Sequence, residues 1–92
     1  MPEHTPWGGR QTYRMTALVL STYGTSCHLC GTDGADSPDH LVPRSKGGSN
    51  ALANLRPAHL GCNRARGDMD LAEWRGRHPL PARPALPPSR KW

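Results

Sequence analysis

Apolar side chains are sparse along this chain, and their spacing predicts one helix before the first cysteine. Residues 10–22 (RQTYRMTALVLST) have the period of an amphipathic helix, which Gly24 then ends. The face expected to turn inward carries Tyr13, Leu18 and Val19, with Met15 at its edge. The longest uninterrupted apolar run, 17–20, is far shorter than the roughly 20 residues that cross a membrane.

After Gly24 the pattern predicts short elements joined by turns. In order, these are a cysteine knuckle at 26–35, an extended segment at 36–43, a polar loop at 44–53, and a helix at 58–67 that starts near His59 and ends at Gly67. A further short helix over 68–77 should pack back on the domain through Leu71 and Trp74, which stand at i,i+3 spacing.

Composition limits the chain to one small domain. Only 35% of its 92 residues are hydrophobic, and glycine and proline number ten each. A chain of this size buries little more than about 60% of its unfolded surface, so an additional staple is expected. We place the domain at 10–77, between a flexible arm at 1–9 and a proline- and arginine-rich, disordered tail at 78–92. The expected class is a small, metal-stabilised α+β fold.

Three cysteines and one histidine offer the metal site that such a fold needs. Cys27 and Cys30 form a C-x-x-C pair, and His59 precedes Cys62 by three residues after a long loop. Two short ligand pairs of this kind supply a structural Zn²⁺ site of the Cys₃His type. A redox C-x-x-C would need a βαβ context, and none is visible. In a second alternative, Cys62 is a buried apolar residue and His59 lies on the surface. The chain would then have no metal site to stabilise its small core.

The charge of the chain is compatible with a nucleic-acid partner. Twelve Lys and Arg against seven Asp and Glu give a formal charge of +5. Segment 71–92 holds most of the excess, with five cations and one acid, whereas 27–70 carries five of each. A GC-rich coding sequence would also favour arginine in this way, so the position of each cation carries more information than the sum. The N-terminal residues have neither the basic start nor the apolar stretch of a secretory signal, which predicts a cytoplasmic protein without a membrane partner.

A longer motif spans the two ligand pairs. It consists of C-x-x-C (27–30), D-H-L-V-P (39–43), G-G (47–48), N-L (54–55) and H-L-G-C-N-R-A-R-G-D (59–68). These elements, in this order, resemble the HNH endonuclease family, and the resemblance covers most of the predicted domain. It implies a ββα-metal (His-Me finger) fold with an N-terminal helix and a zinc knuckle. It also implies a metal-dependent DNA endonuclease that nicks or cuts both strands by hydrolysing phosphodiester bonds.

The resemblance assigns roles to four polar residues. His40 would be the general base, and Asn54 would fix the loop and, through it, the orientation of His40. Asp39 and Asn63 would hold the catalytic cation, and their oxygen donors suit Mg²⁺ or Mn²⁺. Asn63 stands where many relatives have the final histidine, and His59 stands where the commonest pattern has cysteine. Each of these residues alone would more simply be a surface, turn or capping residue.

Four cations flank the candidate site on both sides and are expected to contact DNA phosphates: Arg44, Lys46, Arg64 and Arg66. Solvated surface is the alternative for each of them. His28, between the two knuckle cysteines, is expected to face solvent rather than to bind a metal.

Two other functions fit parts of the sequence. One is a zinc-finger module that binds nucleic acid without cutting it, and the other is an adaptor in a packaging or restriction complex, with the proline-rich tail as its docking segment. The four polar residues of the motif favour the nuclease, because a pure binding module would not need them. In size the chain resembles the small stand-alone HNH proteins of bacteriophages and mobile elements. This resemblance also suggests a link to phage DNA packaging.

Overall fold

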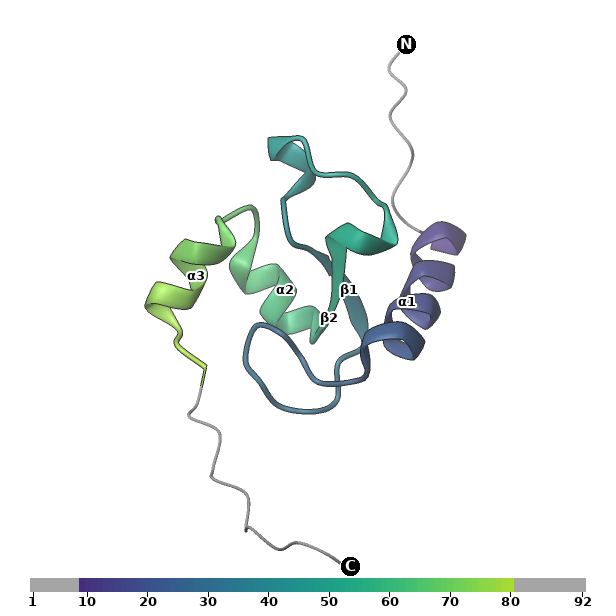
Figure 1. Cartoon of the computed structure of the whole chain (residues 1–92), viewed down its shortest axis with the longest axis horizontal. Coiled ribbons are helices and arrows are strands. Elements are labelled where there is room, and N and C mark those ends of the chain that lie inside the picture. Colours follow the sequence, from purple (N-terminus) through teal and green to yellow (C-terminus); the bar gives the residue numbers. More distant parts are fainter. Residues whose placement is uncertain (1–8, 81–92) are drawn as a thin grey trace, which may run out of the picture.

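The computed structural model describes residues 9–80, and in it a two-stranded hairpin separates one helix from two others. Figure 1 shows α1 (Gly9–Tyr23) on one side of the hairpin and α2 (Leu60–Arg66) and α3 (Leu71–Arg77) on the other. This order of helix, hairpin and helices confirms the predicted small α+β class. None of the helices in the described residues is long and apolar enough to cross a membrane.

The hairpin joins β1 (Ser37–His40) to β2 (Leu55–Ala58) in an antiparallel register, with Ser37 opposite Ala58. Each strand holds a proline, and the two prolines face each other. A sheet of two strands tolerates them because both strands are edges, where a missing N–H leaves no ladder incomplete. The apolar pattern did not place β2, since an arginine and a proline interrupt it.

Helix α1 packs against both strands, but not through the whole of the predicted face. Val19 is fully buried, whereas Tyr13 is 77% and Leu18 is 44% exposed, so the expectation for these two residues was wrong. At 3.6 residues per turn, Tyr13 lies about 120° around the helix from Val19. The inward positions include Met15 and Leu20, which are partly buried.

A small core lies between the hairpin and α3. Its buried members are Cys27, Leu29, Ala35, Ala58 and Trp74. Trp74 is held in place because its Nε1 donates a hydrogen bond to the Leu29 carbonyl at 3.0 Å. Leu71 packs against the same cluster, which confirms that the helix after the motif folds back on the domain. The predicted arm and tail fall on residues 1–8 and 81–92, apart from Gly9 and 78–80, and those stretches lie outside the described part of the chain.

The segment between the strands, 41–54, is a long loop closed at its base by Asn54. The Asn54 carboxamide accepts a hydrogen bond from Val42 N at 3.0 Å and donates to Val42 O at 3.1 Å and Ser49 O at 2.8 Å. Short 3₁₀ turns at Arg44–Lys46 and Leu52–Asn54 shape the rest. Gly48 lies so close to this clamp that a Cβ atom there would be 1.7 Å from Val42 O.

Gly48→Ala is therefore expected to destabilise the protein. The added methyl group would meet the Val42 carbonyl and, at 2.9 Å, the Asn54 amide nitrogen, so the loop would have to move. Overpacking of this kind costs about 1–3 kcal/mol, which thermal unfolding measures as a lower Tm. Gly61→Ala is the matched control, because no atom lies within 4 Å of its Cβ and alanine favours the helix there. Equal Tm values for the two variants would contradict the role given to Gly48.

Candidate functional site

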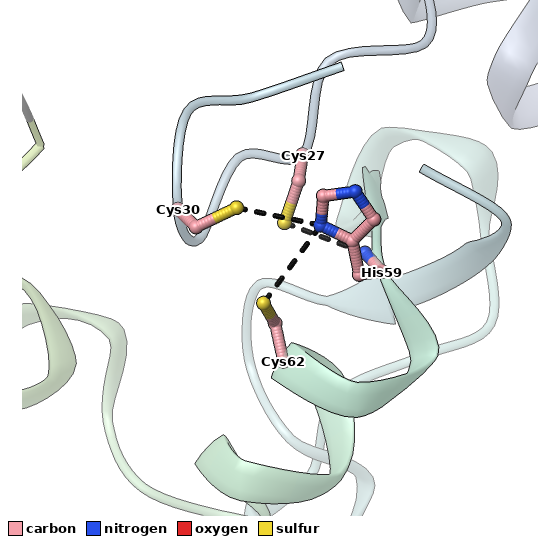
Figure 2. A group of neighbouring side chains, drawn as sticks. All are labelled: Cys27, Cys30, His59 and Cys62. Atoms are coloured by element: carbon pink, nitrogen blue, oxygen red, sulfur yellow. Dashed lines mark hydrogen bonds between the residues drawn. The ribbon is translucent and has the colours of Figure 1, made fainter. Parts of the chain in front are cut away.

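Four side chains that are far apart in the sequence meet beside the N-terminus of α2. The ligand atoms of Cys27, Cys30, His59 and Cys62 all lie within 4.8 Å of one another (Figure 2). The first pair comes from the knuckle, residues 26–35, while His59 directly precedes α2 and Cys62 lies in its first turn. Three thiols and one imidazole are the donors of a closed, tetrahedral zinc site, so the cluster fits the structural zinc predicted from the spacing.

The ring of His59 is oriented for metal binding. Its Nδ1 faces the sulfur atoms, at 3.3 Å from Cys30 Sγ and 3.8 Å from Cys62 Sγ. Its Nε2 donates to the Asp33 carbonyl at 2.9 Å, and this bond is the main reason that the His59 pKa is raised. A ring that donates through Nε2 keeps its lone pair on Nδ1, which is the arrangement found when histidine binds a metal. Gly34 leaves room for it, since a Cβ there would be 3.2 Å from Nε2.

Two of the thiols differ in acidity. A hydrogen bond with Thr32, at 3.2 Å between Sγ and Oγ1, lowers the pKa of Cys30 to about 6. Burial raises the pKa of Cys62 to about 12. Thiolates are the form that binds zinc, and a bound cation deprotonates its thiol ligands. Cys30 is thus prepared for the metal by the knuckle, whereas Cys62 loses its proton only to the metal itself.

A pocket of about 240 Å³ opens at the other end of α2. It is lined by Pro38, Asp39, His40, Pro43, Arg44, Ser45, Asn63, Gly67 and Asp68. The structure thereby brings together Asp39, His40 and Asn63, which the family resemblance assigned to one site. They come from the end of β1 and the middle of α2, two elements that contact each other.

The oxygen atoms of Asp39 and Asn63 are set by hydrogen bonds on the far side of each group. Asp39 is 3% exposed, and its Oδ2 accepts from His28 Nε2 and from Arg66 Nη1, both at 2.7 Å. Within residues 9–80, Asp39 Oδ1 accepts no hydrogen bond. Asn63 Nδ2 donates a hydrogen bond to Pro38 O at 3.1 Å, which leaves the amide oxygen of Asn63 as the atom that could bind a cation. A carboxylate and a carboxamide oxygen suit a hard divalent cation.

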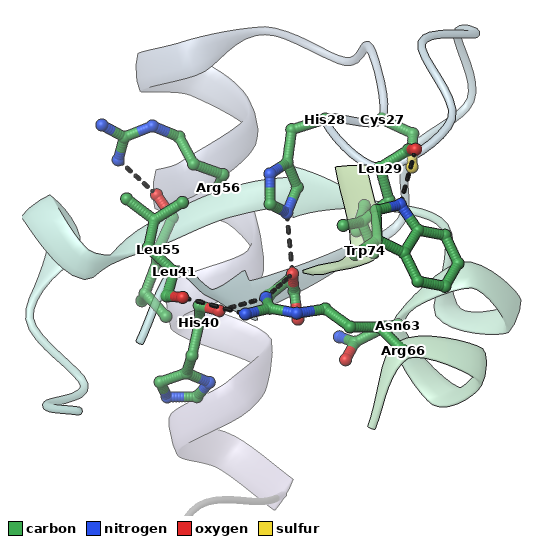
Figure 3. A network of polar contacts seen from close by, with 12 residues as sticks. Cys27, His28, Leu29, His40, Leu41, Leu55, Arg56, Asn63, Arg66 and Trp74 are labelled. Atoms are coloured by element: carbon green, nitrogen blue, oxygen red, sulfur yellow. Dashed lines mark hydrogen bonds and ion pairs between the residues drawn. The ribbon is translucent and has the colours of Figure 1, made fainter. Parts of the chain in front are cut away.

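His40 is half-buried and is held by a residue that the sequence did not single out. Its Nε2 lies 2.8 Å from Asn50 Oδ1, and its imidazole points away from Arg66 (Figure 3). Asn50 belongs to the loop that Asn54 closes, and it directly follows Ser49, whose carbonyl Asn54 binds. The sequence offered no specific signal for this pair, because Asn50 is one of many polar residues in the loop and lies ten positions after His40.

Two expectations about polar residues were wrong. His28 does not face solvent, since its side chain is 12% exposed and bonded to Asp39. Arg66 is no surface phosphate contact, because it is 2% exposed and its guanidinium binds Asp39 and the carbonyls of His40, Leu41 and Met69. Figure 3 shows the guanidinium reaching from α2 toward β1. Its position three residues after Asn63 places both on one helix face, a signal that was available in the sequence.

The other three predicted DNA contacts differ in their surroundings. Arg44 lines it, and Arg64 is exposed on α2. Lys46 forms an exposed ion pair with Asp70 at 2.9 Å, and this bond raises the Lys46 pKa and lowers that of Asp70. Such pairs contribute little to stability, so a phosphate can replace the carboxylate at small cost.

Comparison with known families agrees with these two sites. The family described as HNH endonuclease matches residues 27–69, which include both the cysteine cluster and the pocket. No curated protein and no solved structure matches the chain.

Removal of zinc is expected to unfold the domain. A structural zinc site contributes about 10–16 kcal/mol, which is as large as the whole net stability of about 5–15 kcal/mol of a typical domain. A zinc chelator should abolish the far-UV circular dichroism of the helices, and added Zn²⁺ should restore it. His59→Gln should behave as the chelated protein does, whereas His78→Gln, which changes an exposed histidine stacked on Trp74, should stay folded. A chelated protein with an unchanged spectrum would rule out the structural role.

Proposed function

Because residues 27–69 match the HNH endonuclease family, we propose that the protein is a metal-dependent DNA endonuclease that hydrolyses phosphodiester bonds. Nucleases of this family act on DNA. The observation that carries the proposal is the pocket in which a carboxylate, an imidazole and a carboxamide meet. These groups supply what the hydrolysis needs, namely a base for the attacking water and oxygen ligands for a cation.

Asp39 and Asn63 are the proposed ligands of the catalytic Mg²⁺ or Mn²⁺. The fit rests on donor chemistry, since each residue uses other atoms for the protein and retains an oxygen. When bound, such a cation stabilises the charge that develops on the phosphate and on the leaving oxygen. The formal charge of 27–70 is zero, so metal ions would supply much of the positive field at the pocket.

His40 is the proposed general base. The Asn50 carboxamide oxygen accepts a hydrogen bond from Nε2–H, so the lone pair of the neutral ring is on Nδ1. Asn54 supports this arrangement from a distance, because its bond to the Ser49 carbonyl fixes the segment that carries Asn50. In this scheme Nδ1 accepts the proton of the attacking water, while Asn50 and Asn54 keep the ring in one tautomer and one orientation.

His40→Ala is expected to abolish cleavage and to leave folding, zinc content and DNA binding unchanged. Loss of a general base lowers the rate about 10²–10⁴-fold, which a plasmid-nicking assay with Mn²⁺ measures as initial rate. His78→Ala is the matched control and should cleave at the wild-type rate. Full activity of His40→Ala would exclude the base assignment. A wild-type protein that binds DNA and cuts none with any divalent metal would instead favour the non-catalytic binding module.

Binding to DNA is expected to weaken steeply with salt, through Arg44, Lys46 and Arg64. Each cation that neutralises a phosphate adds about 0.9 to the slope of log affinity against log salt. Arg64→Ala should reduce this slope by about 1 without changing sequence preference. Arg77→Ala is the control, because this exposed cation lies on α3, which contributes no residue to the lining of the pocket. Fluorescence anisotropy between 50 and 200 mM salt tests the idea, and a salt-insensitive affinity would refute it.

A further inference from the structure

His28 connects the zinc knuckle to the pocket. It stands between two zinc ligands in the sequence, Cys27 and Cys30, and its backbone N–H donates to the Pro57 carbonyl at 2.9 Å. Its side chain then reaches Asp39, with 2.7 Å between Nε2 and Oδ2. Both side chains are nearly buried. The knuckle thus contacts a proposed ligand of the second metal directly.

Arg66 reaches the same carboxylate oxygen from α2. Its Nη1 donates to Asp39 Oδ2 at 2.7 Å and also to the His40 carbonyl, while Nη2 donates to Leu41 O at 2.9 Å. The Arg66 side chain is fully buried, and it is the charge partner that a buried carboxylate requires. Because the guanidinium is planar and bonded to several carbonyls, it cannot rotate away from Asp39.

Two donors on one oxygen fix the rotation of the Asp39 carboxylate. One donor comes from the knuckle and one from α2, so rotation about the terminal bond would break both hydrogen bonds. The unbonded atom Oδ1 belongs to a residue that lines the pocket. Outer hydrogen bonds of this kind orient metal ligands in many proteins.

We propose that His28 and Arg66 are positioning residues that hold Asp39 Oδ1 for the divalent cation, so that the zinc knuckle also orients a ligand of the second metal. The inference rests on the proposed function, since it presupposes a cation at Asp39. His28 is the more informative of the two, because the backbone bond to Pro57 and the flanking zinc ligands already hold the knuckle. Its imidazole is therefore available for the carboxylate rather than needed for the fold.

The test compares two substitutions at His28. His28→Leu has similar bulk and no donor, whereas His28→Gln keeps an N–H that can reach Asp39. Mn²⁺ binding to the zinc-loaded protein without DNA is measured from the electron paramagnetic resonance signal of free Mn²⁺. His28→Leu should weaken binding about 10-fold, with one zinc retained and an unchanged circular dichroism spectrum, and His28→Gln should recover most of the affinity. The Mn²⁺ concentration for half-maximal cleavage should rise by the same factor, while the rate at saturating Mn²⁺ stays near that of the wild type.

Controls separate this inference from the proposed function. His78→Leu should bind Mn²⁺ as the wild type does, and Asp39→Asn should lose the site. Arg66→Lys keeps the positive charge but loses the planar guanidinium that bonds Asp39 and the carbonyls together. A folded Arg66→Lys should therefore also bind Mn²⁺ more weakly. A wild type that binds Mn²⁺ and cleaves, together with a His28→Leu of equal Mn²⁺ affinity, would overturn the positioning role alone. If Mn²⁺ bound equally well to the wild type and to Asp39→Asn, or bound to neither, both proposals would be wrong.

Discussion

The four ligands of the Cys₃His cluster hold together segments that the small core could not. Cys27 and Cys30 precede the hairpin, and His59 and Cys62 follow it, so one zinc ion would close the chain around both strands. The buried core has few large side chains, among which Leu29, Leu55 and Val19 are the largest that are fully enclosed. A chain with this little apolar burial gains more from a metal than from any single contact. Positions of the knuckle, β1 and α2 relative to one another all follow from this constraint.

Around that cluster, polar groups take the place that apolar packing has in larger domains. Arg66 is a buried cation in a very small protein. Its burial is tolerated because each nitrogen of its guanidinium donates a hydrogen bond to a carboxylate or a carbonyl. Trp74 likewise uses its ring nitrogen on the Leu29 carbonyl. Asn54 closes the loop with three hydrogen bonds to backbone groups. These contacts are directional, so they fix the pocket more tightly than the same area of aliphatic contact would.

Much of the architecture could be predicted from the sequence, and what was missed has a common cause. The helices over 10–22 and 58–67 and the Cys₃His cluster follow from local spacing, and the observed bounds differ by one or two residues. By contrast, the partners of His28 and of Asn50 lie 11 and 10 residues away, and no period links them. Strand β2 was not placed because Arg56 and Pro57 hide its alternation. The spacing of Asn63 and Arg66 puts both on one face of α2, but the burial of Arg66 also depends on β1, whose Asp39 lies 27 residues away in the sequence.

Helix α2 carries a consequence for insertions and deletions. Cys62 and Asn63 are consecutive, and Arg66 follows within one turn, so α2 supplies residues to both sites. One residue added between His59 and Cys62 would turn everything after it by about 100° and move it by about 1.5 Å. The spacing between His59, Cys62, Asn63 and Arg66 therefore does not tolerate an insertion or a deletion. The loop at 44–48 is restricted in a different way, because Asn54 fixes the chain on either side of it, Arg44 and Ser45 line the pocket, and Gly48 packs against the Val42 carbonyl.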